Sequence, residues 1–254
     1  MPAELTSLGG GALALMAVGG VLIGFSKTSF GGIGAVAAVL FALAMPPKES
    51  TAAVLLLLIV GDAIGVWLYG RHASWRLIVR LIPTVIAGLL IGAAFIRFVD
   101  DVLMRRTIGV LLLVSVGLQV VQRLRTRPDD PPPTGAIHPV AAGAAGMAAG
   151  FTTMTANAAG PVMALYFLAS RIDKKRFIGT NAWFFAAINL AKTPLSGALG
   201  LYTPQVLWAW VAMVPAVLVG AVLGRLIIGR VTQRQFELVT MAASAFASLV
   251  ILLR

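Results

Sequence analysis

The chain has 254 residues, of which 59% are hydrophobic and only 11% are charged. A soluble domain carries about 25% charged residues, so this composition excludes a water-soluble globule and indicates a chain solvated by lipid. The net charge of +11 does not indicate nucleic-acid binding, because the basic residues lie in short loops between apolar runs. The absence of cysteine excludes disulfides, thiolate chemistry and cysteine-based metal sites.

Ten apolar runs follow one another along the chain. They occupy residues 8–25, 31–45, 51–69, 77–96, 103–121, 138–155, 158–170, 178–199, 205–228 and 235–253. Because no water satisfies backbone polar groups inside a bilayer, each run is predicted to be helical. The sequence therefore predicts an all-α polytopic membrane protein with eight to ten spans, in which runs 1–2 and 6–7 are broken or re-entrant helices.

Two sequence patterns recur in the two halves of the chain. GFSKTSFGGIG begins at Gly24 and is matched by GFTTMTANAAG, which begins 126 residues later at Gly150. PTVIAGLLIG begins at Pro83 and is matched by PAVLVGAVLG, which begins 132 residues later at Pro215. These matches predict a first transmembrane repeat at 1–122, a cytoplasmic linker at 123–137 and a second repeat at 138–254. Since each half holds five runs, an odd number, the second copy is expected to be inverted.

The distribution of basic residues predicts the orientation in the membrane. Thirteen of the 20 Lys and Arg residues lie in loops on the side opposite the N-terminus, five lie on the N-terminal side, and two lie inside apolar runs. Cytoplasmic loops carry the excess of Lys and Arg, so both termini are predicted to lie outside a prokaryotic inner membrane. This prediction holds whether runs 1–2 and 6–7 span the membrane or are re-entrant.

Runs 31–45 and 158–170 are short for a bilayer, and each follows a break rich in Gly, Ser and Thr. Short, interrupted segments at matching positions of two repeats indicate a substrate site. A helix that begins inside the membrane presents free N–H groups and a positive dipole end, which favour an anion. The side chains predicted to cap these helix starts or to donate to the ligand are Ser26, Thr28, Ser29, Thr152, Thr153, Thr155 and Asn157. Bonding to the preceding helical turn is the alternative for each hydroxyl.

Three ionisable residues lie within the apolar runs or their breaks. Lys27 lies in the first break, where it either adds positive charge to an anion site or snorkels to the surface. Lys192 shares one helical face with Asn189, and this face is predicted to line a cavity. Asp62 is the one carboxylate well inside a run; it is a candidate for proton coupling, with a structural ion pair or a helix cap as the alternative.

The sequence contains no pattern typical of an enzyme. It shows no nucleophile–histidine–acid set, no paired carboxylates in a span, no metal-ligand cluster and no phosphate-binding loop. No cofactor and no metal are therefore expected. A membrane-embedded enzyme acting on lipid phosphates is a remote alternative, because it would need buried catalytic Glu, His or Arg.

The G-F-[ST] break, its echo in the second half and the twin P-x4-G-x3-G segments resemble the TauE/SafE family of sulfite exporters, also called TSUP, over almost the whole chain. The resemblance implies an inner-membrane permease of two repeated halves that exports sulfite, sulfoacetate or a related organosulfonate. Alternating access is the expected mechanism, and an anion channel or an importer of another sulfur compound is the alternative. Protons as the coupling ion and a homodimeric assembly are left open.

Overall fold

The computed structural model describes residues 9–29, 34–125, 138–170 and 174–227, together with positions 242, 245 and 249. Every regular element within these residues is a helix. The elements are α2 (Gly9–Thr28), α3 (Gly34–Ala44), α4 (Pro47–Tyr69), η1 (Gly70–His72), α5 (Trp75–Phe98), α6 (Asp101–Arg125), α7 (Pro139–Ala156), α8 (Gly160–Ala169), α9 (Lys174–Ala198) and α10 (Pro204–Ile227). The predicted all-α class is thus confirmed. The last predicted run, 235–253, lies outside the described residues apart from three positions.

Five of the described helices are long and apolar enough to cross a membrane, namely α2, α4, α5, α6 and α10. The chain is therefore a multi-pass membrane protein. Of these five, α4 is the most buried, with 56% of its most apolar stretch covered by the rest of the protein. Because α4 also packs against α9, these two helices form the centre of the bundle.

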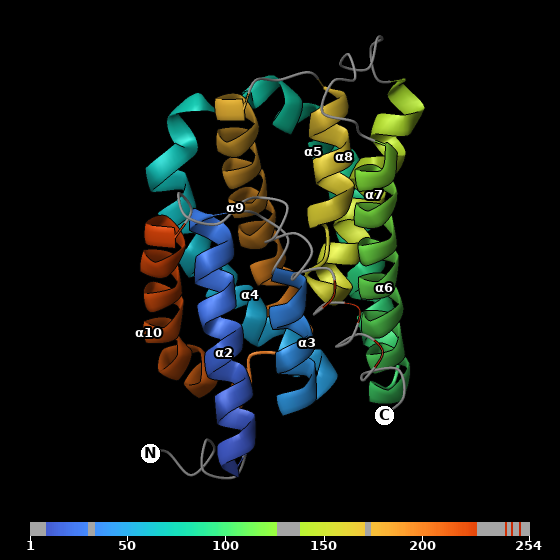
Figure 1. Ribbon diagram of the computed structural model, residues 1–254. Helices are drawn as coiled ribbons and strands as arrows, with labels where there is room; N and C mark the ends of the chain where they lie inside the picture. The colour runs from blue at the N-terminus through green and yellow to red at the C-terminus, as the bar shows by residue number, and fades with distance from the viewer. Residues whose placement is uncertain are drawn as a thin grey trace.

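Helices α3 and α8 are too short to cross a bilayer. They contain 11 and 10 residues, and at a rise of about 1.5 Å per residue they extend about 16 and 15 Å, roughly half the thickness of a hydrocarbon core. Each is preceded by a long helix, so α2–α3 and α7–α8 form two helical hairpins. Figure 1 shows α2 beginning at the lower end of the molecule and α7 beginning at the upper end, so the hairpins enter from opposite sides. These lengths support the re-entrant form of the prediction for runs 1–2 and 6–7.

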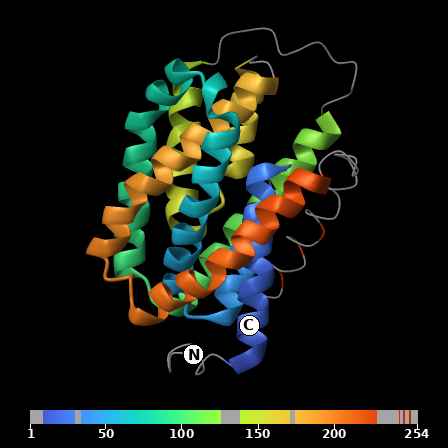
Figure 2. The same ribbon diagram turned by 90° about the vertical axis from the view of Figure 1, so that its left-hand side faces the viewer.

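Each hairpin packs against a long helix from the other half of the chain. Helix α10 lies alongside α2, as Figures 1 and 2 both show, and α5 packs against α7 in the same manner. A Cβ atom at Gly24 would collide with the backbone of Val217 and Ala221, so only glycine permits this approach.

The same contact occurs a second time, at the residues that the sequence repeat relates to the first. A Cβ atom at Gly150, 126 residues after Gly24, would collide with the backbone of Val85 and Leu89. These two residues precede Val217 and Ala221 by 132 positions, which is the offset of the second sequence match. The repeated patterns therefore encode one helix-packing arrangement that is used twice.

Side-chain hydrogen bonds also join the two halves at both ends of the bundle. At the upper end, the Ser74 backbone N–H donates to Thr180 Oγ1 at 2.8 Å. At the lower end, Thr203 Oγ1 donates to Glu49 Oε2 at 3.2 Å. A surface cavity of about 350 Å³ lies near this lower bond. It is lined by Pro46, Lys48, Glu49, Asp101, Gly200, Leu201 and Thr203.

Candidate functional site

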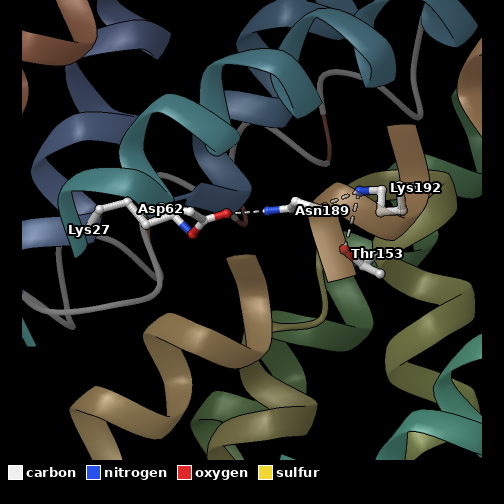
Figure 3. A network of polar contacts seen from close by, with 5 residues as sticks. All are labelled: Lys27, Asp62, Thr153, Asn189 and Lys192. Carbon is white, nitrogen blue, oxygen red and sulfur yellow. Dashed lines mark hydrogen bonds and ion pairs between the residues drawn. The ribbon is translucent and has the colours of Figure 1, made fainter. Parts of the chain in front are cut away.

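A chain of hydrogen-bonded polar side chains lies between the two hairpins and joins Lys27 to Lys192 (Figure 3). Lys27 Nζ lies 2.5 Å from Asp62 Oδ1 in an ion pair. The second oxygen of Asp62, Oδ2, accepts a hydrogen bond from Asn189 Nδ2 at 2.6 Å. The Asn189 side-chain oxygen in turn lies 3.4 Å from Lys192 Nζ. The carboxylate thus accepts from both a lysine and an amide.

Lys192 is surrounded by three side-chain oxygens. Its Nζ donates to Asn157 Oδ1 at 2.5 Å, to Thr153 Oγ1 at 3.3 Å and to Asn189 Oδ1 at 3.4 Å. An ammonium group has three donors and no acceptor, so three oxygens match a protonated lysine. Among the described residues no carboxylate lies within ion-pair distance of Lys192 Nζ, which makes it a buried cation held by neutral groups.

Both amides beside Lys192 are held by a bond on their far side. The Asn189 NH2 group donates to Asp62, which turns its oxygen toward the lysine. The Asn157 NH2 group donates to the backbone carbonyl of Thr51 at 3.1 Å, with the same effect. Because an amide has its donor and its acceptor on opposite branches, these bonds determine which atom faces the cation.

The centre of the chain of contacts is isolated from solvent and carries a positive charge. Asp62 and Lys192 are 2% and 1% exposed, and the Lys27 side chain is 17% exposed. With both lysines protonated and Asp62 ionised, two ammonium groups against one carboxylate give this region a net charge of +1. The ring of Phe185 lies 5.1 Å from Lys27 Nζ and offsets part of the cost of burying that cation. Electrostatic interactions are stronger at low dielectric, so this centre attracts a negative charge.

Local sequence explains how these side chains meet. Lys27 and Thr153 are each the third residue after the glycine of the G-F-[ST] pattern, and each lies in the last turn of its helix, α2 or α7. Asn189 and Lys192 are three residues apart on α9, so they share a face as predicted. The two breaks therefore bring equivalent positions to one region, where one carries a lysine and the other a threonine.

The predicted capping of helix starts by the hydroxyls of the breaks is wrong for the described residues. Ser26 and Thr28 lie within the last turn of α2, with Ser29 directly after it, and Thr152, Thr153 and Thr155 lie within α7. Several of these hydroxyls donate instead to carbonyls of the preceding turn, because no water is available to them there. These bonds run from Ser29 to Phe25 at 2.5 Å, from Thr152 to Ala148 at 2.7 Å and from Thr155 to Phe151 at 2.8 Å.

Thr28 makes a different contact. Its Oγ1 donates to the Ala221 carbonyl at 2.8 Å and so joins α2 to α10. Ser26 is half-buried and takes no part in the hydrogen bonds that link Lys27 to Lys192. Of the ten side chains predicted to bind substrate, five therefore lie in one chain of contacts together with Asp62, and five lie beside it. The five in the chain are Lys27, Thr153, Asn157, Asn189 and Lys192.

Two groups that sequence reasoning missed complete the site. The Phe185 ring faces Lys27, and its position four residues before Asn189 on α9 was a usable signal. The Thr51 carbonyl holds the Asn157 amide, but a backbone acceptor leaves no sequence signal. A small packing defect, too narrow for a water molecule, lies beside Asn157 and is also lined by Thr51.

Comparison with known proteins gives one match. The family model described as "Sulfite exporter TauE/SafE" matches residues 16–251, which is nearly the whole chain. The matched range includes every residue of the chain of contacts. No curated protein and no solved structure matches the chain.

Proposed function

Because the chain belongs to the sulfite exporter TauE/SafE family and is a membrane transporter of sulfur anions such as sulfite, we propose that it is a secondary transporter that exports sulfite or an organosulfonate such as sulfoacetate across the inner membrane by alternating access. The observation that carries the proposal is the buried ammonium of Lys192, which is held by neutral oxygens between two interrupted hairpins. A buried charge without a counter-ion is costly, and an anion would relieve that cost.

The anion would bind at Lys192, with its oxygens accepting hydrogen bonds from Nζ and from the side chains around it. Thr153 and Asn189 can turn a donor toward an added oxygen, because a hydroxyl rotates and an amide has two N–H bonds. Of the remaining hydroxyls, those of Thr28, Ser29, Thr152 and Thr155 would have to give up bonds to helix carbonyls before they could contribute. The remaining hydroxyls are proposed as the two walls of the site, with Ser26, Thr28 and Ser29 on one side and Thr152 and Thr155 on the other.

Lys27 and Asp62 would set the charge of the site. While Asp62 is ionised it neutralises Lys27, and the region carries +1. A proton on Asp62 would release the charge of Lys27 and favour anion binding, and by reciprocity a bound anion would favour that proton. Asp62 is therefore the proposed coupling residue.

Export and proton coupling at Asp62 are alternatives, since a proton bound together with the anion would be carried in the same direction as the anion. An interior-negative potential alone drives a monovalent anion outward, by about 2.3 kcal/mol per 100 mV. An anion that carries a proton with it gains nothing from the potential, and an inward proton gradient would then drive uptake. A flux that ignores a pH gradient supports uncoupled export, whereas a flux accelerated inward by that gradient supports the importer alternative.

Orientation is part of the same proposal. We place the upper end of the bundle, with η1 and the start of α9, in the cytoplasm, and both termini outside. The natural chain contains no cysteine, so single cysteines can be introduced without a background. A membrane-impermeant thiol reagent added to intact cells should label Asp101→Cys and spare Arg71→Cys. Labelling of Arg71→Cys alone would reverse the orientation.

The test of function is a flux assay in proteoliposomes. Sulfite, sulfoacetate, thiosulfate and sulfate are compared with and without a pH gradient, in the wild type and in Lys192→Gln. We expect Lys192→Gln to lower sulfite flux at subsaturating concentration by at least about tenfold, since it removes a charged donor from the site. Arg106→Gln is the control, because it removes an exposed positive charge at the membrane edge.

Three results would contradict the proposal. Wild-type flux of a folded Lys192→Gln protein would exclude Lys192 as the anion site. Flux that does not saturate with substrate would indicate a channel instead of a carrier. No flux of any of the four anions by the wild type would remove the assignment altogether.

A further inference from the structure

Asn157 has a backbone conformation that few residues adopt. Its φ of 52° and ψ of 32° place it in the left-handed helical region, and among the described residues it is the only one other than glycine with a positive φ. It terminates α7, where its backbone N–H donates to the Thr153 carbonyl at 3.1 Å. Asparagine tolerates this conformation better than most residues, so the chain can reverse here and begin α8 three residues later.

The side chain of Asn157 makes the shortest contact with Lys192. Its Oδ1 lies 2.5 Å from Lys192 Nζ, whereas the oxygens of Thr153 and Asn189 lie at 3.3 and 3.4 Å. Lys192 is 1% exposed, so no water competes for its ammonium group. The amide oxygen of Asn157 thus supplies the closest negative partial charge to a buried cation.

Among the described residues, Asn157 Nδ2 has a single partner, and a small packing defect lies beside the side chain. Its Nδ2 donates to the Thr51 carbonyl at 3.1 Å. This defect, too small to hold a water molecule, lies against both Asn157 and Thr51 and is otherwise lined by Ala38, Ser50, Ile108 and Ala156. A rotation of the Asn157 side chain, together with a shift of the residues around this defect, would withdraw Oδ1 from Lys192.

We propose that Asn157 Oδ1 occupies the position on Lys192 that an oxygen of the transported anion takes, and that the amide withdraws when the anion binds. The inference rests on the proposed function and changes the part that Asn157 plays in it. Asn157 competes with the substrate for the cation and does not add to the substrate's ligands. The amide keeps the buried ammonium hydrogen-bonded while the site is empty. A substrate must therefore bind Lys192 more tightly than the amide does in order to displace it.

This exchange links anion binding to the joint between α7 and α8. When Oδ1 leaves Lys192, the bond from Nδ2 to Thr51 must shift with it, because both atoms belong to one planar amide. Thr51 lies on α4, so the hairpin α7–α8 loses a contact with the central helix. Occupancy of the site is thereby communicated to the hairpin that must move for transport.

Glycine at position 157 tests the proposal, because glycine adopts a positive φ without strain and lacks the amide. Binding of radiolabelled sulfite is measured with the purified full-length wild type, Asn157→Gly, Asn157→Asp and Lys192→Gln. We expect Asn157→Gly to bind sulfite about tenfold more tightly, since the anion no longer displaces a bond to a charged group. Asn157→Asp should lose binding, because its carboxylate would pair with Lys192 and would be harder to displace than an amide.

The outcomes separate this inference from the function on which it rests. If Asn157→Gly binds sulfite as weakly as Lys192→Gln, Asn157 is a direct ligand and the inference is wrong. Unchanged affinity in Asn157→Gly also overturns it, because competition would then be absent. If the wild type itself fails to bind sulfite, the proposed function fails first. Size-exclusion profiles identify any variant that misfolds, and Asn157→Ser, which also lacks the amide oxygen, then replaces the glycine variant with the same expectation.

Discussion

The ion pair between Lys27 and Asp62 allows a quantitative prediction for Asp62→Asn. At 2.5 Å and an effective dielectric constant of about 20, the gross attraction between two unit charges is about 7 kcal/mol, much of which offsets the cost of desolvation. Removing one partner of a buried pair typically costs about 3–5 kcal/mol, because the other charge remains buried. Lys27 is 17% exposed and lies over Phe185, so it retains some stabilisation. We therefore expect a loss near the lower limit, about 3 kcal/mol.

The assay is the rate of thermal inactivation in detergent, since unfolding of a membrane protein is commonly irreversible. A loss of about 3 kcal/mol in the native state accelerates inactivation by up to about a hundredfold at fixed temperature, to the extent that the pair is already broken in the transition state. Lys27→Met combined with Asp62→Asn should restore much of the stability, because no unpaired charge is then buried. Equal inactivation rates for wild type and Asp62→Asn would refute this reasoning. So would a double variant that is less stable than Asp62→Asn.

Two further predictions concern packing. Gly24→Ala should destabilise the protein by several kcal/mol, because its methyl group would overlap the backbone of Val217, whereas Gly117→Ala, which has no neighbour within 4 Å, should be neutral or slightly stabilising. Inactivation rates of the two variants test this, and equal rates would contradict the close helix contact. Phe185→Leu should cost about 0.5–2 kcal/mol by removing the aromatic face from Lys27, and it should cost less when Lys27 is also replaced by Met. An effect of Phe185→Leu that is the same with and without Lys27 would exclude the interaction.

Much of the architecture could be predicted because the bilayer permits few backbone structures. Hydropathy alone located the apolar runs. The run predicted at 77–96, for example, corresponds to α5 at Trp75–Phe98. The duplicated patterns also correspond to equivalent packing in the two halves, since Gly24 and Gly150 make equivalent helix contacts. The division into repeats at 1–122 and 138–254 stays a prediction, because most of the linker lies outside the described residues.

The site was only partly predictable, for reasons that are local. The spacing of Asn189 and Lys192 placed both on one face of α9, and both are buried. Whether Lys27 pairs with Asp62 could not be decided, because the residues are 35 positions apart on different helices. The helix ends at the breaks were misjudged, since hydroxyls are equally compatible with the end of one helix and the start of the next. The end of α7 could have been recognised from Asn157, because an asparagine after a helical run is typical of a left-handed helix end.

The distribution of contacts between the halves bears on how such a site can move. Lys27 and Asp62 both belong to residues 1–122, and Lys192 and its three oxygen partners all belong to residues 138–254. Among the described residues, two amide hydrogen bonds join the halves at this site: one from Asn189 to Asp62 within the chain of contacts, and one from Asn157 to Thr51 beside it.

A displacement of one half against the other at this level therefore breaks two amide bonds and leaves the ion pair intact. Separating a buried ion pair costs several kcal/mol, whereas a hydrogen bond between an amide and a carbonyl contributes about 1 kcal/mol and one to a carboxylate about 1.5–3 kcal/mol. If transport proceeds by the proposed alternating access, keeping the charges within their own halves would lower its barrier. Asn157→Gly, which removes one of the two amide links, should for this reason also raise the exchange rate of a transporter that works in this way.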